Sequence, residues 1–363
     1  MKKILLTSTA MVAFAGAASA EVLISGLAEM GIQYGDGGVA ATDNTVEFFT
    51  DIDVTFTMTG ETDGGLVFGA DIDLDESDGS DRDNTTTTGT VDPGPDGILG
   101  TDDDSQTFDI PGSTGGSPAF NDRTQGGEAI FISGGFGTLT AGDTDGAIDW
   151  ALTEVAFASG SINDDETEHA GYNGNAALDG TFDGQILRYD YSVGDFGVAL
   201  SAEIDDGDTD QDEASSVLGI GFKYGVDLGG GQVSFGIGYQ AGENFNDNDL
   251  DDPIDDVEAI GASLNGTFGA FTAGLSYLNV DAGDSLAGYD HYGIGVGYVT
   301  GAISLSANYG DYDFDNGTDQ DGYGITAGYD LGGGAAVQFG YGDSNFSDAD
   351  DFETMSFGVA LAF

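Results

Sequence analysis

Several residue types are missing or scarce in this sequence. It contains no cysteine, which excludes disulfides, thiol catalysis and thiolate metal sites. Basic residues are few, because six Lys and Arg stand against 66 Asp and Glu. Nucleic acid and anionic lipid surfaces are therefore poor partners, whereas cations are favoured. Acidity of this degree is also typical of proteins adapted to salty surroundings, and composition alone does not separate the two explanations.

Catalytic groups are equally scarce. The two histidines, His169 and His291, have no nucleophile elbow and no metal-ligand spacing around them. The glycine-rich stretches precede no predicted helix, so they do not form phosphate-binding loops. We therefore predict that the protein is not an enzyme and requires no cofactor.

The first twenty residues have the pattern of an export signal. Lys2 and Lys3 precede an apolar run over residues 4–17, and Ala18-Ser19-Ala20 forms a cleavage site. We predict a signal peptide over residues 1–20 and a mature domain over 21–363. Removing the signal leaves four basic residues against 66 acidic ones, a formal charge of −62. No other stretch reaches about 18 apolar residues, which excludes a membrane protein built of helices.

Alternation of apolar and polar residues is the main structural signal. The last nine residues place Met355, Phe357, Val359, Leu361 and Phe363 on one parity and small residues on the other. Successive side chains of a strand point to opposite faces, so one face of this final strand is apolar. The apolar positions of residues 46–58 likewise alternate with Glu47, Asp51 and Asp53, and those of 66–74 with Asp71 and Asp73.

Sixteen such segments occur along the chain, and their connections alternate between short and long. The segments lie near residues 22–34, 45–59, 65–75, 126–134, 137–143, 185–193, 197–205, 215–224, 232–241, 257–268, 270–280, 289–299, 302–311, 321–330, 335–342 and 352–363. An even number of strands with short turns at one end and long loops at the other is typical of bacterial outer-membrane barrels. We predict an all-β fold, a transmembrane antiparallel β-barrel of sixteen strands with short periplasmic turns and long outer loops. The alternative is a secreted or surface-layer calcium-binding protein made of β-sandwiches.

Three features also carry a family resemblance: the start Glu21-Val-Leu-Ile-Ser-Gly26, the hairpin over residues 134–143 and the C-terminal Phe363. Together they resemble the general porins of the alphaproteobacterial outer membrane. The hairpin is the most specific, because in these porins it leads directly into a long third loop. The resemblance spans the mature chain, although the acidic second loop, residues 76–125, is longer than usual. It implies a homotrimeric channel for passive diffusion of small hydrophilic solutes, and an assembly machinery that reads Phe363 as a signal.

The candidate third loop, residues 144–184, is rich in acids and contains no Lys or Arg. The resemblance implies that it folds into the pore, where a ring of carboxylates selects cations. The alternative is a solvated outer loop whose acids only coat the surface. The apolar residues of 148–157 are expected to hold it against the barrel wall. The candidate constriction residues are Asp145, Asp149, Glu154, Asp164, Asp165, Glu166 and Glu168.

Two bases are placed on the inner face by their parity. Arg188 and Lys223 both alternate with apolar neighbours, and a base on the lipid face at mid-membrane costs about 2–4 kcal/mol. One interpretation sets them opposite the loop acids, with a transverse field across the pore. The other is local pairing with a wall carboxylate. The remaining candidate wall residues are Glu47, Asp51, Asp53, Asp71 and Asp73.

Residues 92–103 are similar to a calcium-binding loop. Asp92, Asp96, the carbonyl of Ile98 and Asp103 match ligand positions, and Gly97 matches the sharp turn. The pattern lacks a side-chain oxygen at Gly94 and ends in Asp instead of Glu. We predict a structural calcium ion here, with an acidic flexible insertion as the alternative.

These observations favour an outer-membrane channel that prefers cations. Its expected partners are outer-membrane lipid, further copies of itself, small hydrophilic solutes, cations and the barrel-assembly machinery, and not nucleic acid. A solute-specific channel, for example one for carbohydrates, is the second alternative.

Overall fold

The computed structural model describes residues 21–36, 45–75, 124–158, 160–162, 166–182, 184–204, 216–243, 257–282, 288–347 and 349–363. The chain divides into two compact units, residues 1–74 with 125–363, and residues 75–124. Only the two end residues of the second unit are among those described.

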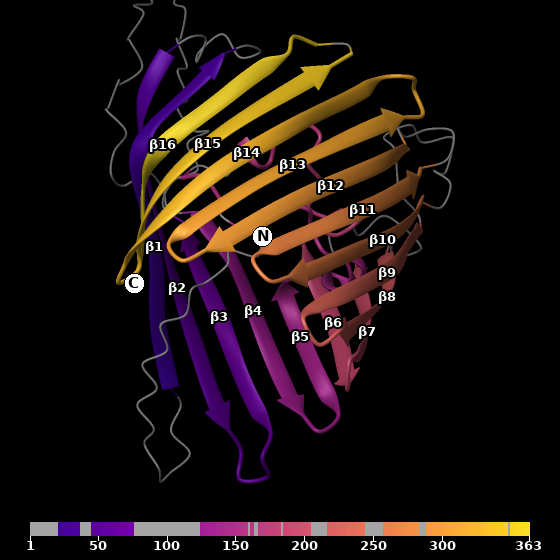
Figure 1. Cartoon of the computed structure of the whole chain (residues 1–363). Coiled ribbons are helices and arrows are strands. Elements are labelled where there is room, and N and C mark those ends of the chain that lie inside the picture. Colours follow the sequence, from indigo (N-terminus) through magenta and orange to yellow (C-terminus); the bar gives the residue numbers. More distant parts are fainter. Residues whose placement is uncertain are drawn as a thin grey trace, which may run out of the picture. The chain divides into compact units, whose positions relative to one another are not determined.

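Sixteen strands form one closed antiparallel barrel, in which consecutive strands are neighbours and β16 pairs with β1 (Figure 1). This confirms the predicted fold class. The strands are β1 (Glu21–Asp36), β2 (Thr45–Glu61), β3 (Val67–Asp75), β4 (Thr124–Gly134), β5 (Gly137–Asp143), β6 (Gln185–Val193), β7 (Phe196–Ile204), β8 (Ser216–Asp227), β9 (Gly231–Glu243), β10 (Val257–Phe268), β11 (Phe271–Asp281), β12 (Tyr289–Thr300), β13 (Ile303–Phe314), β14 (Asp319–Gly332), β15 (Ala335–Phe346) and β16 (Phe352–Ala362).

The first and last strands close the ring. Their register runs from Leu27 opposite Ala362 to Asp36 opposite Glu353. Just beyond β16, the Phe363 N–H donates to the Gly26 carbonyl at 2.9 Å, and the Gly26 N–H donates to the Phe363 carbonyl at 3.3 Å. A closed ring leaves no unpaired strand edge.

The two faces of the barrel wall differ as the alternation predicted. On β16 the side chains of Met355 and Phe357 are 42% and 52% exposed, whereas Ser356 between them is buried. On β2, Phe48 and Ile52 are exposed, whereas Asp53 on the other parity is buried. One face is thus apolar, and the other carries small and polar residues. A register slip of one residue would exchange the two faces along a whole strand, so this pattern fixes the register.

Tyrosines on the apolar face lie near both ends of the strands. Tyr191 and Tyr224 lie toward the short turns, and Tyr239 and Tyr277 lie toward the opposite ends. The hydroxyl of Tyr239 donates to Glu258 at 2.8 Å, and that of Tyr277 donates to Asp290 at 2.6 Å. Such rings combine an apolar body with a polar tip, which suits a boundary between lipid and water.

Two outer connections are shorter than the sequence predicted. Loops were expected near 312–320 and 343–351, but β13 and β14 leave only residues 315–318, and β15 and β16 leave only 347–351. The Phe314 N–H donates to the Thr318 carbonyl at 3.0 Å, which continues the hairpin to its tip. Backbone pairing therefore extends through Asp-rich residues whose composition is typical of loops. Among the described residues, no helix is long and apolar enough to cross a membrane.

Candidate functional site

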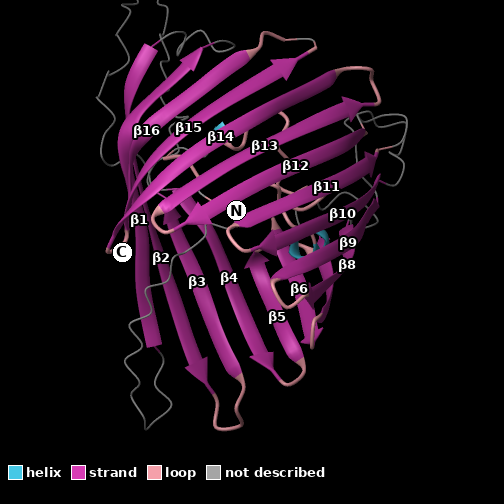
Figure 2. Ribbon diagram, viewed as in Figure 1, coloured by secondary structure: helices cyan, strands magenta, loops and turns pink. Residues whose placement is uncertain are grey.

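Residues 144–184 connect β5 to β6, and we call them the inner segment, because those of them that the structure describes lie inside the barrel. It contains the one short helix of the described residues, α1 (Ala147–Ala151), which Figure 2 shows in cyan. Its described residues contact strands β7 to β16 and β1 on the face of small and polar side chains. A single segment touches so many strands of a closed ring on one face only if it runs across the lumen. The predicted inward fold is therefore what the structure shows.

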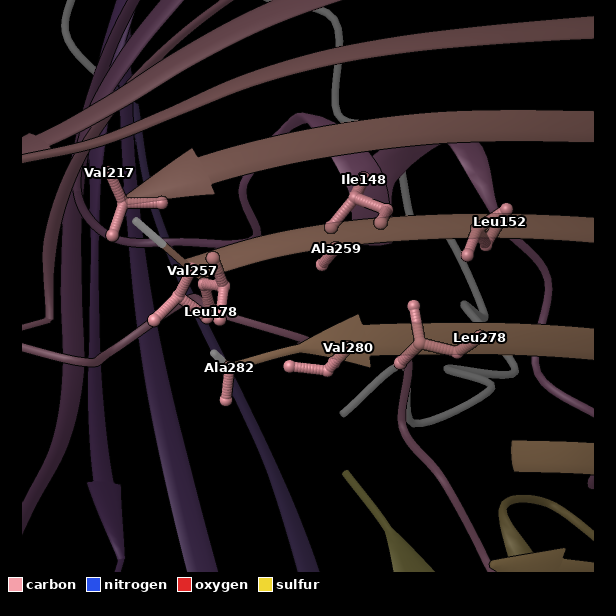
Figure 3. Close-up of a cluster of buried hydrophobic side chains, with 9 residues drawn as sticks. All are labelled: Ile148, Leu152, Leu178, Val217, Val257, Ala259, Leu278, Val280 and Ala282. Atoms are coloured by element: carbon pink, nitrogen blue, oxygen red, sulfur yellow. The ribbon is translucent and has the colours of Figure 1, made fainter. Parts of the chain in front are cut away.

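Apolar side chains hold the inner segment against the wall near both of its ends. These are the first limb, which contains α1, and the returning limb, which leads into β6. Ile148 and Leu152 at α1 and Leu178 in the returning limb belong to one buried cluster (Figure 3). The wall contributes apolar residues on the inner parity of its strands: Val217 of β8, Val257 and Ala259 of β10, and Leu278 and Val280 of β11. Burying each larger aliphatic side chain stabilises the attachment by about 1.5–3 kcal/mol. We expected apolar residues of 148–157 to hold the segment against the wall, and Ile148 and Leu152 do so.

Glycines of the wall allow the backbone of the inner segment to approach closely. A Cβ atom at Gly295 would overlap the carbonyl oxygen of Val155, and one at Gly310 would overlap that of Gly171. The same holds for Gly221 against the carbonyl of Ala147. Glycine is the residue that permits such contact between two backbones.

Polar side chains of the wall satisfy the backbone of the inner segment. This matters because the segment has little secondary structure and its buried N–H and C=O groups need partners. The contacts come from five strands: Ser201 Oγ to the Ala147 N–H (2.9 Å), Ser263 Oγ to the Thr153 N–H (2.9 Å), Asn308 Nδ2 to the Thr167 carbonyl (2.8 Å), Gln320 Nε2 to the Ala170 carbonyl (2.8 Å) and Ser344 Oγ to the Ala170 N–H (2.9 Å).

The two histidines of the chain meet at one point of this contact. His291 Nε2 donates to the Gly171 carbonyl at 2.9 Å, and His169 Nδ1 accepts from the Gly171 N–H at 3.2 Å. Both side chains are buried. Burial, together with the nearby His291, lowers the pKa of His169 to about 4. Both histidines thus take part in attaching the inner segment to the wall at Gly171.

Carboxylates gather where the two ends of the inner segment meet. Burial first, and then the charges of Asp145, Glu154 and Asp179, raise the pKa of Asp149 to about 7. Burial is also the main cause that raises the pKa of Asp179 to about 7. Glu154 accepts a 2.5 Å hydrogen bond from the hydroxyl of Tyr172. Because both aspartates titrate near neutrality, the negative charge of this group increases with pH.

Arg188 and Lys223 both contact the start of the inner segment, and Arg188 also pairs with a wall carboxylate, Asp190, as the second interpretation expects. Arg188 donates to the Asp145 carbonyl at 2.5 Å and lies 3.9 Å from the Asp145 carboxylate and 3.6 Å from that of Asp190. Lys223 Nζ lies 3.4 Å from the centroid of the Trp150 ring and 3.4 Å from the Trp150 carbonyl oxygen. A cation over an indole face is attracted by the ring quadrupole. Both bases thus lie beside α1, not across from it.

The other expected site residues fall into three groups. Asp145, Asp149 and Glu154 lie in the inner segment as predicted, and Glu168 is exposed there. Glu166 is 1% exposed, because its turn packs on Gly340 and Gly342 of β15, so it does not line the lumen as expected. On the wall, Asp51, Asp53, Asp71 and Asp73 lie on the inner parity, with Asp73 accepting from Thr55 at 3.1 Å.

Some expected residues lie outside the described ones. They are Asp164 and Asp165 of the inner segment, the side chain of Glu47, and the calcium-loop residues Asp92, Asp96, Ile98 and Asp103. Within the described ranges, no group of three or more His, Asp or Glu is arranged to hold a metal ion. The calcium site stays a prediction.

Sequence reasoning missed Glu203 of β7 and Gln240 of β9, which bind the returning limb of the inner segment. Glu203 accepts from the N–H groups of Gly180 (3.1 Å), Phe182 (3.1 Å) and Gly184 (2.9 Å), and Gln240 Oε1 accepts from that of Leu178 (3.0 Å). A long polar side chain among small residues on the inner parity was the available signal.

Comparisons with known proteins agree with this architecture. A family model described as Gram-negative porin matches residues 7–349. A protein named porin from Rhodobacter capsulatus is 27% identical over 355 residues, covering 91% of this chain and 96% of that protein. A porin structure refined at 1.8 Å resolution superposes with a TM-score of 0.65 at 25% identity, covering 94% of this chain and all of that one. An engineered Rh. blastica porin, 21% identical, shares the fold with a TM-score of 0.57 and covers 94% of this chain and all of that one.

Proposed function

The chain belongs to the Gram-negative porin family and forms an outer-membrane channel, and from this premise we propose that the channel prefers cations. Its cargo in this proposal is small hydrophilic solutes and ions, which cross by passive diffusion. The inner segment is the constriction.

The cluster of carboxylates on the inner segment is the observation that supports the proposal. Asp145, Asp149, Glu154 and Asp179 surround the junction of its two limbs. Among the described residues, the Lys and Arg side chains are Arg188 and Lys223, and both contact the same segment. Rings of carboxylates at a narrow point favour cations, because an ion passes them within a few ångströms.

Reversal potentials across a salt gradient in planar bilayers test this preference. The distance over which charges act is about 8 Å at physiological salt and about 3 Å at 1 M. Carboxylates on outer loops should therefore matter little in concentrated salt, whereas those at the constriction remain effective. We expect a cation preference that falls with rising salt but does not vanish. A channel without selectivity, or one that prefers anions at low salt, would contradict the proposal.

Removing either base is expected to strengthen the preference. Arg188→Gln deletes a positive charge and the partner of the Asp145 carboxylate, and Lys223→Gln deletes the charge over Trp150. Glu154→Gln should have the opposite effect, because it deletes a constriction carboxylate. The control is Glu258→Gln on the outer face of β10, which removes one charge outside the channel. An unchanged permeability ratio in all three constriction variants would place the filter elsewhere on the wall.

We further propose that the channel is a homotrimer in outer-membrane lipid and that the barrel-assembly machinery inserts it. The support is family membership together with the exposed apolar outer face. The mass of the particle extracted in mild detergent, compared with that of the denatured chain, tests the assembly. A particle of one chain would contradict it.

A further inference from the structure

The two limbs of the inner segment are joined at their base by Asp179. Its carboxyl group accepts from the Gly146 N–H at 2.7 Å and from Gln240 Nε2 at 2.5 Å. Gln240 in turn accepts from the Leu178 N–H at 3.0 Å. One side chain thus ties the first residues of the inner segment to its last residues and to β9.

Glu203 of β7 holds the limb that follows Asp179. The side chain is 2% exposed, and both carboxylate oxygens accept backbone N–H groups of residues 180–184. Gly180 and Gly184 adopt φ of +75° and +76°, so no regular structure directs this limb. Three donors stabilise a buried carboxylate that would otherwise be costly, and the donors are in turn fixed by it. The path of the limb therefore depends on Glu203.

The charge of Glu203 also contributes to the raised pKa of Asp179. The charged neighbours that influence Asp179 are Asp145 within the inner segment and Glu203 on β7, and Asp149 lies close enough for its own titration to be coupled to it. The donors that oppose them are the Gly146 N–H and the Gln240 amide, and Arg188 on β6 pairs with Asp145. Burial and these like charges raise the pKa of Asp179 from 3.8 to about 7.

The sign of the linkage follows from the raised pKa. The folded state holds this proton more tightly than the unfolded chain, so the contribution of Asp179 to stability is fully present below 3.8 and is lost as pH rises through about 7. Above that pH the inner segment carries one more negative charge, and its attachment is weaker.

We propose that Glu203 is a positioning residue of the channel, which fixes the returning limb through its three hydrogen bonds and thereby holds Asp179 at the constriction. The inference rests on the proposed cation preference. It adds a pH-dependent element to that preference and names a wall residue that holds the titrating group in place.

The test is the cation-to-anion permeability ratio between pH 5 and pH 9. For the native channel we expect the ratio to rise with pH around a midpoint near 7, the pKa of Asp149 and Asp179. Glu203→Gln keeps the size of the side chain but removes its charge, one of the like charges that raise the pKa of Asp179, so the midpoint should fall. Asp179→Asn should reduce the height of the step. Glu258→Gln, which removes a carboxylate from the outer face, should leave the midpoint in place.

A second variant separates charge from position. Glu203→Asp retains the charge but withdraws it from the limb, so the midpoint should stay near that of the native channel while current noise and hydrogen exchange of residues 180–184 increase. This variant also serves if Glu203→Gln does not fold. A native midpoint in Glu203→Gln, or unaltered exchange in Glu203→Asp, would overturn the inference. A native channel without cation preference at any pH would instead refute the proposed function.

Discussion

Replacing Gly310 with valine is expected to lower the single-channel conductance severalfold and to make the current noisy. Gly310 of β13 and Gly171 of the inner segment touch backbone to backbone, and a Cβ atom on either would overlap the carbonyl oxygen of the other. No flexible side chain is available to yield, and overpacking of this kind costs about 1–3 kcal/mol or more. The inner segment must therefore move away from the wall and into the lumen.

The movement would also break two hydrogen bonds beside the contact. They are the 2.9 Å bond from His291 to the Gly171 carbonyl and the 3.0 Å bond from the Tyr312 hydroxyl to the Tyr172 carbonyl. Gly174→Ala is the matched control, because a Cβ at that glycine meets nothing within 4 Å. Equal conductance in Gly310→Val and the native channel would show that the segment does not depend on this contact.

Replacing Phe363 with serine is expected to reduce strongly the amount of folded protein in the outer membrane. The ring is 78% exposed, so little packing within the chain depends on it. The backbone bonds between Phe363 and Gly26 do not require the ring. We therefore expect Phe363→Ser to refold in detergent almost as well as the native chain and to fail mainly in cells, which is the outcome that recognition of the terminal aromatic by the assembly machinery predicts.

Phe357→Ser provides the comparison on the same strand. Phe357 is also on the outer face, at 52% exposure, so this variant loses a similar apolar ring away from the terminus. Its level in the outer membrane should fall less than that of Phe363→Ser. Similar losses in both variants would indicate that apolar surface, and not the terminal position, governs insertion.

The strands could be predicted from the sequence because a period of two is a local signal. On β2, Phe48, Ile52 and Asp53 reveal the two faces without reference to any other strand. Where acids occupy the outward-facing positions, the acidic composition predicted a loop although the period of two continued. Asp313 lies on the same parity as Asp311, two residues beyond the predicted end of the strand, and pairs with Asp319 of β14. The sequence predicted a loop at Asp313 only because Asp is unfavourable in most strands.

The placement of the inner segment is a different matter, because it depends on contacts between distant residues. Asn308 binds the Thr167 carbonyl across 141 positions of the chain, and no local pattern encodes that distance. A partial signal was nevertheless present. Val257, Leu278 and Val280 are apolar on the inner parity, where a water-filled lumen would favour polar residues. Apolar residues on both faces of neighbouring strands indicate that something covers the inner one.

The wall glycines have a consequence for how such a channel changes in evolution. Gly221, Gly295 and Gly310 contact carbonyl oxygens of the inner segment. Every amino acid has this oxygen, so these contacts do not depend on the side chains of the segment. The side chains that face away from these contacts are free to vary without moving the backbone that carries them. In the proposed channel, exchanging residues such as Asp149 or Glu154 would therefore change the permeability while the backbone beneath them stays in place.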